Sequence, residues 1–239
     1  MKKSIYEKFL DFKKRHNLSN EEITAIATDY ANSSLELARS YFSEKYGISK
    51  HVFYKARDYA IIFCLVDQKT YDQIKIKSGA NYSSNNVQSS NVSSRMHFSK
   101  LLNQRVEFFN SFTEKEIIDI GHKYTSGVSL KNIAIAYDTG EFAIQHLLKK
   151  GTIELIYDAT MVTLIGKFAE KSGFDKILQK REVNKKLLLD CLQKQISFLE
   201  SQILCYNLFF RNSSNKPTLE DLKNEVKNAI KMYNETLKL

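Results

Sequence analysis

Apolar residues recur at helical spacing along most of the chain, and polar residues that favour helix starts divide this pattern into segments. Two of these segments, 19–30 and 113–124, share one pattern. Each begins with Ser or Thr followed three residues later by Glu, which is the capping box that starts a helix. Isoleucine, isoleucine and tyrosine then fall at the same offsets in both segments, as expected for one buried stripe. The pattern predicts two copies of a single helical unit.

The match between the copies continues beyond the first helix. Each copy has a short Ser- or Gly-containing break, a second helix, a turn, a third helix and then an apolar residue followed by aspartate. That aspartate, Asp67 or Asp158, is expected to cap a fourth helix. The turn is expected at 44–49 in the first copy and, in a shorter form, at 138–139 in the second. The expected helices are 35–41, 50–57 and 68–77 in the first copy and 130–137, 140–147 and 159–171 in the second.

These units divide the chain into four expected regions. The first domain covers 1–77 and the second covers 95–175, with a Ser/Asn-rich linker or loop at 78–94 between them. The C-terminal region, 176–239, begins with about three heptads of apolar residues, which is the lower limit for a coiled coil. We expect this stripe to form an oligomer, most simply a dimer, and the alternative is packing within the chain. The stripe consists of Leu188, Leu192, Ile196, Leu199, Ile203 and Tyr206.

A second C-terminal helix is expected after the break at 212–217, because Thr218 and Asp221 form another capping pattern. Two helices joined by such a loop would form an antiparallel hairpin. Composition agrees with helices throughout, since the 239 residues include only 1 Pro and 8 Gly, whereas β-sandwiches and barrels need frequent turn residues. The predicted fold class is therefore all-α, with two helix-turn-helix units and a C-terminal helical hairpin or coiled-coil-like segment.

Each copy has the residues that a helix-turn-helix motif requires. A small residue, Ala38 or Ala134, lies in the second helix of the unit, where the third helix must cross it closely. Gly47 or Gly140 supplies the turn between these two helices. The third helix of the unit would enter the major groove with its N-terminal residues facing the base edges. In the first copy, the candidate DNA-binding residues are Lys45, Ser49, Lys50, His51, Tyr54, Lys55 and Arg57.

The second copy is less suited to DNA. Its outward candidates include Gln145 and Lys149, but also Glu141, whose carboxylate would be repelled by phosphates. The formal net charge of +9 and the pI of about 9.2 favour a polyanionic partner such as nucleic acid. Double-stranded DNA is therefore the expected partner, contacted mainly by the first copy.

The run from Leu35 to Ile76, especially LARSYFSEKYGISKHVFYKARDYAIIFCLVD, resembles helix-turn-helix segments of the resolvase/sigma-region-4-like type. Such segments occur in regulators of Gram-positive bacteria, their phages and their mobile elements. The stretch 129–158 resembles the same pattern with a trimmed turn. The likeness is at the level of a superfamily and covers less than half of the chain. It implies that the residues facing DNA are Ser49, Lys50, His51, Tyr54 and Lys55.

Enzyme, metal and cofactor functions are not predicted. The chain has no GxxxxGK[ST], GxGxxG, HExxH or GxSxG motif, and its five histidines are scattered. The three cysteines, Cys64, Cys191 and Cys205, lack metal-ligand spacing and are expected to be buried, reduced thiols. With no signal-peptide core and no apolar run long enough to span a bilayer, we expect a cytoplasmic protein without a membrane partner.

The leading expectation is a sequence-specific DNA-binding protein, namely a transcriptional regulator of a bacterial, phage or mobile-element system. One alternative is a phage DNA-packaging protein of the small-terminase kind or a plasmid-partition protein, which would bind DNA with the same unit. An alternative of another class is a protein-binding inhibitor or adaptor of the anti-defence type that has reused the helix-turn-helix fold.

Overall fold

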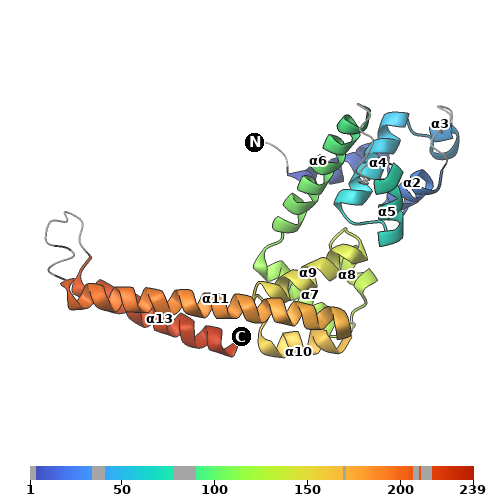
Figure 1. Ribbon diagram of the computed structural model, residues 1–239. Helices are drawn as coiled ribbons and strands as arrows, with labels where there is room; N and C mark the ends of the chain where they lie inside the picture. Colours follow the sequence, from blue (N-terminus) through green and yellow to red (C-terminus); the bar gives the residue numbers. More distant parts are fainter. Residues whose placement is uncertain (1–3, 34–40, 78–89, 169–170, 207–209, 211–216) are drawn as a thin grey trace. The chain divides into compact units, whose positions relative to one another are not determined.

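The computed structural model of the chain describes residues 4–33, 41–77, 90–168, 171–206, 210 and 217–239, and all regular structure in these residues is helical (Figure 1). The predicted all-α class is confirmed. Contacts divide the chain into two compact units, Met1–Leu147 and Leu148–Leu239, with the boundary inside one helix. The third helix of each copy, which begins at Lys50 or at Glu141, therefore starts in the first unit.

The first unit contains eight complete helices and the start of a ninth within the described residues. They are α1 (Ile5–His16), α2 (Asn20–Asn32), α3 (Tyr41–Tyr46), α4 (Lys50–Ile62), α5 (Gln68–Lys77), α6 (Ser90–Asn110), α7 (Glu114–Thr125), α8 (Leu130–Ala136) and α9 (Glu141–Ile153), whose last residues belong to the second unit. Helix α6 begins before the expected end of the linker at 78–94, and residues 78–89 lie outside the described part of the chain.

An aromatic cluster joins α1, α4 and α6 in the core of the first unit. The rings of Phe9 and Phe63 stack with their centroids 4.1 Å apart, and the Phe63 ring lies 4.6 Å from that of Phe108. All three side chains are fully buried. Burial of a phenylalanine contributes on the order of 1.5–3 kcal/mol, so this cluster fixes α1 firmly against α4.

The predicted helix caps are confirmed by their hydrogen bonds. Ser19 and Thr113 each form a capping box with the glutamate three residues later, and Thr218 forms one with Asp221. Asp67 Oδ1 accepts a hydrogen bond from the Thr70 amide at 2.7 Å, and Asp158 Oδ1 accepts one from the Met161 amide at the same distance. These caps satisfy amides that a helix start would otherwise leave unpaired.

The two copies keep a constant spacing of 91 residues from Tyr46 and Tyr137 to Asp67 and Asp158. Left-handed backbone recurs at this spacing. It occurs at Gly47 and Asp138 before the third helix and at Cys64 and Leu155 after it. The same spacing relates the buried inner faces of the third helices, which are Val52, Phe53, Ala56 and Arg57 in α4 and Ala143, Ile144, Leu147 and Leu148 in α9.

This register corrects the turn expected in the first copy. Helix α3 ends at Tyr46, so three residues separate it from α4, and three residues also separate Tyr137 from α9. The third helix of the second copy begins at Glu141 rather than at Gly140. The first copy is three residues longer between its capping box and Tyr46, a stretch that includes 34–40. Most of the expected helix 35–41, with Ala38, lies outside the described residues.

The second unit contains the end of α9 followed by α10 (Ala159–Phe168), α11 (Lys171–Leu204) and α13 (Leu219–Lys238). Helices α11 and α13 lie side by side as an antiparallel hairpin (Figure 1). Arg181 of α11 is buried and donates hydrogen bonds to the backbone oxygens of Thr152, Tyr157 and Leu239 at 2.9, 2.9 and 2.5 Å. It thereby joins the end of α9, the loop that follows and the end of α13.

The hairpin changes the interpretation of the heptad stripe. Leu192, Ile196 and Leu199 are buried within the single chain, where α11 packs on α13. Ile203 and Tyr206 are half-buried, and Leu188 is exposed. The burial of its central residues agrees with the alternative of packing within the chain, and an oligomer interface on this stripe stays a prediction.

The cysteines are free thiols, but only one of them is buried as expected. Burial raises the pKa of the Cys64 thiol, and the nearby Arg105 offsets only part of this effect, so the pKa is about 11. Cys191 is exposed and Cys205 is half-buried, in contrast to the prediction of core positions. In the described part of the chain, no helix combines the length and the apolar character needed to cross a membrane.

Candidate nucleic-acid interface

The candidate interface is the N-terminal half of α4, which follows a tight turn. Gly47 adopts a φ of 63°, a left-handed conformation that side chains disfavour, and this reverses the chain after α3. Ser49 then caps α4, with its hydroxyl accepting a hydrogen bond from the Val52 amide at 3.4 Å. Ser49 is also a predicted DNA contact, and it is exposed.

The inner face of α4 is apolar and buried, and this fixes which residues face outward. Val52, Phe53 and Ala56 are in the core, with the Phe53 ring 4.4 Å from that of Phe42 on α3. Lys50, His51 and Lys55 consequently lie on the exposed side. Three of the residues predicted to face DNA are thus brought together on one helical surface.

None of these three residues forms an ion pair with a carboxylate in the described chain. Their contacts are with aromatic rings. The Lys50 ammonium lies 5.8 Å from the ring centroid of Tyr54, and that of Lys55 lies 5.6 Å from the centroid of Phe12. Such contacts orient the stems while leaving the ammonium groups uncompensated by a negative charge.

Two other predicted contact residues, Tyr54 and Arg57, contact each other within the protein. Arg57 is only 8% exposed, and its Nε donates to Asp58 Oδ1 at 2.9 Å. Its guanidinium lies 4.6 Å from the ring centroid of Tyr30 and 5.0 Å from that of Tyr54, which is half-buried. Arg57 therefore belongs to the inner face of α4, and its assignment to the outward face was wrong.

Lys45 is exposed but bonded to Asp29 of α2, which also accepts hydrogen bonds from Tyr41, at 3.0 Å, and from Tyr46. Burial raises the pKa of Asp29, but the hydrogen bonds from Lys45, Tyr46 and Tyr41 lower it more, so the pKa lies below its usual value. This network joins α2 to α3. It leaves Lys45 less free than Lys50 or Lys55 to bind an external anion.

A groove that the sequence analysis did not identify lies between α1 and α4. It has a volume of about 250 Å³ and is lined by Lys8, Asp11, Phe12, Arg15, Lys55 and Tyr59. The Tyr59 hydroxyl donates to the Lys8 carbonyl at 3.3 Å and so joins the two helices. The contribution of α1 could not be read from the sequence, because only tertiary packing brings Lys8 and Arg15 beside Lys55.

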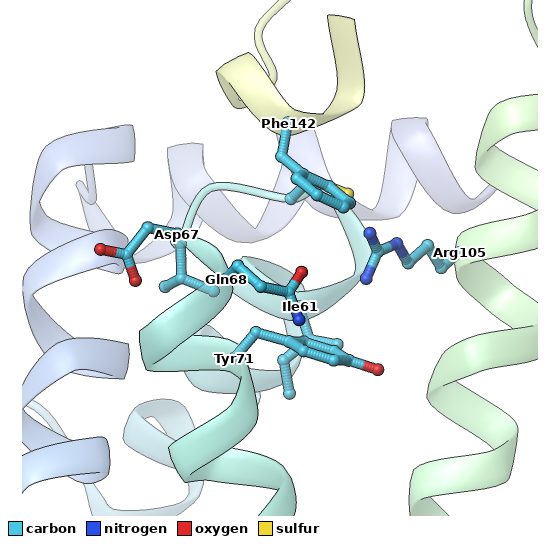
Figure 2. Close-up of a pocket in the computed structure, with 8 residues that line it drawn as sticks. Ile61, Asp67, Gln68, Tyr71, Arg105 and Phe142 are labelled. Carbon is cyan, nitrogen blue, oxygen red and sulfur yellow. The ribbon is translucent and has the colours of Figure 1, made fainter. Parts of the chain in front are cut away.

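The outward face of α9 in the second copy differs. At the 91-residue spacing, Lys50 corresponds to Glu141, His51 to Phe142 and Lys55 to His146. The His146 ring stacks on Phe109 with centroids 4.0 Å apart. Figure 2 shows Arg105 of α6 reaching toward Phe142 and Tyr71, with its guanidinium 5.1 and 5.3 Å from their ring centroids. Phe142 and His146 of this face therefore contact α6, while Glu141 and Gln145 remain exposed.

The turn before α9 is also occupied by contacts with the first copy. The Thr139 hydroxyl and the Gly140 amide both donate to the Phe63 carbonyl, at 2.7 and 3.1 Å. Asp138 Oδ1 accepts from Lys13 at 2.7 Å and from Asn20 at 2.8 Å. The second copy thus uses its turn to bind the first copy. The predicted DNA contacts Gln145 and Lys149 are exposed on α9.

A larger groove, of about 960 Å³, runs between α2 and the start of α9. Its charged residues are Glu21, Asp29, Asp67, Glu141 and Lys131. Because carboxylates predominate, this side of the first unit repels phosphates. Within the described residues, no group of three or more His, Cys, Asp or Glu side chains could hold a metal ion. Comparisons of the chain with protein-family models, curated proteins and solved structures found no match.

Proposed function

We propose that this protein binds double-stranded DNA through the N-terminal half of α4. The observation that carries the proposal is that some cations of this region have a carboxylate partner and others do not. Lys50, His51 and Lys55 are exposed without a carboxylate partner in the described chain, whereas Lys45 and Arg57 are neutralised by Asp29 and Asp58. Folding thus leaves an anion-attracting surface at the start of one helix.

The position of these residues suits the major groove. A helix that follows a tight turn and presents its first two turns outward can insert those residues between the phosphate ridges of a duplex. Lys50 and Lys55 can donate to phosphates or to guanine O6 and N7, and His51 can reach a base edge. Because α9 presents Glu141 and Phe142 at the corresponding positions, we assign DNA contact to the first copy alone.

The matching experiment removes charge from α4 while leaving its inner face intact. We expect the double variant Lys50→Ala with Lys55→Ala to weaken binding of a labelled duplex by at least tenfold at low salt, measured by fluorescence anisotropy. The matched control, Lys115→Ala with Lys131→Ala, removes the same charge from exposed positions on α7 and α8 and should change affinity little. Equal losses in both variants, or no duplex binding by the unaltered protein, would contradict the proposal.

The biological role that we propose is regulation of transcription in a bacterial, phage or mobile-element system. The same surface would serve a DNA-packaging or partition protein, so the role depends on which sites are bound. Recovery and sequencing of genomic fragments held by the full chain distinguishes these roles. Short sites beside promoters support a regulator, whereas clustered repeats at one locus support packaging or partition.

A further inference from the structure

We propose that the groove between α1 and α4 binds a backbone phosphate of the nucleic acid whose bases face α4. This inference rests on the proposed function and adds a second contact to it. The groove is formed by Lys8 and Arg15 of α1 together with Lys55 of α4. The groove therefore adjoins the exposed face of α4, but most of its lining residues belong to α1.

The charge of the groove calls for an anion. Lys8, Arg15 and Lys55 converge there, and none of them forms an ion pair in the part of the chain that the structure describes. Asp11 is the single carboxylate in the lining, so positive charge is in excess. Cations gathered in this way repel one another, and binding a phosphate would convert that repulsion into attraction.

The groove also has a fixed floor. The Phe12 and Tyr59 rings pack with centroids 5.0 Å apart, and the centroid of the buried Phe9 ring lies 5.2 Å from that of Tyr59. The Lys55 ammonium lies over both floor rings, 5.6 Å from the centroid of Phe12 and 5.9 Å from that of Tyr59. These contacts position Lys55 over the aromatic floor, and Lys8 and Arg15 are exposed on α1 at the edge of the same groove.

The same contacts define the class of ligand. A nucleobase would need an open aromatic face on which to stack. In this groove Lys55 covers the rings, and Phe12 is only 4% exposed. A phosphodiester needs only converging donors, which two ammonium groups and one guanidinium provide. Lys55 also belongs to the outward face of α4. The bound phosphate would therefore lie in the DNA backbone next to the bases that α4 contacts.

The test is the salt dependence of duplex binding by the full chain. Each phosphate contact contributes about 0.9 to the slope of log K against log salt concentration. We expect the double variant Lys8→Gln with Arg15→Gln to lower that slope by roughly 1, with little change in preference between duplex sequences. The control is Lys14→Gln, which removes one exposed charge from the same helix outside the groove and should leave the slope unchanged.

The outcomes separate the two proposals. If the unaltered protein binds duplex and the groove variant has the same slope as Lys14→Gln, the phosphate site is overturned while DNA binding by α4 stands. If the unaltered protein does not bind duplex, both proposals fail. Phosphatidylglycerol vesicles serve as a second probe. Capture by vesicles that depends on Arg15, without binding of duplex, would assign the groove to a membrane surface and overturn the nucleic-acid site.

Discussion

At the scale of single residues, Gly140 shows how closely the two copies of the unit approach. A Cβ atom built on this glycine would lie 1.7 Å from the carbonyl oxygen of Cys64, which is backbone and cannot rotate away. The Gly140 amide also donates to the neighbouring Phe63 carbonyl. A glycine at this position is thus required by close approach of two backbones, and not by its own dihedral angles.

We therefore predict that Gly140→Ala destabilises the protein by about 2 kcal/mol or more, because the segments at 63–65 and 139–140 must separate to admit the methyl group. Urea unfolding followed by circular dichroism measures the change. Gly173→Ala is the control, since its Cβ would meet nothing within 4 Å in helix α11, and alanine there should be neutral or slightly stabilising. A similar midpoint for both variants would refute the close approach.

At the scale of helices, the termini and their caps could be predicted from sequence, whereas partners could not. The Ser19 and Thr113 boxes and the Asp67 and Asp158 caps depend on hydrogen bonds within a few residues, so the local sequence specifies them. The register of the third helix was misjudged by one residue, because the left-handed turn at Asp138 is not marked by glycine. Only the structure shows it as the equivalent of Gly47.

Which face meets which neighbour depends on contacts that are distant in sequence. Arg57 was assigned to the DNA face because it is charged, but Tyr30 on α2 and the adjacent Asp58 give it a buried site. The heptad stripe of α11 is compatible with a second chain or with packing within the chain, and only the structure shows that α13 packs on α11. The groove that includes Lys8 and Arg15 could not be predicted for the same reason, since α1 and α4 are distant in sequence, with α2 and α3 between them.

The hairpin yields a prediction for Arg181, the buried cation that joins three segments of the second unit. Arg181→Met retains much of the apolar stem but leaves the backbone oxygens of Thr152 and Tyr157 without this donor. Loss of a donor to buried oxygens costs about 1–3 kcal/mol, so we expect a clearly lower urea midpoint. Lys180→Met, at an exposed neighbouring position, is the control. If the two variants unfold at the same urea concentration, Arg181 does not hold these segments together.

At the scale of the whole molecule, the distribution of charge matters more than its sum. The net charge of +9 alone would attract any polyanion to any part of the surface. The fold brings cations of α4 and α1 to one groove and places carboxylates around the groove beside α2. At physiological salt the Debye length is about 8 Å, so a charge far from the bound duplex contributes little. Affinity should consequently depend on where a charge lies.

This leads to a comparison of two charge reversals that change the net charge equally. Lys50→Glu places on α4 the residue that α9 has at the corresponding position, and Lys186→Glu reverses an exposed charge on α11. We expect Lys50→Glu to weaken duplex binding by at least tenfold at physiological salt, because a carboxylate beside phosphates repels them, while Lys186→Glu changes affinity by less than about twofold. Equal weakening in anisotropy titrations would mean that the total charge, rather than the surface of α4, accounts for binding. A larger loss for Lys186→Glu would instead place the principal contact on α11.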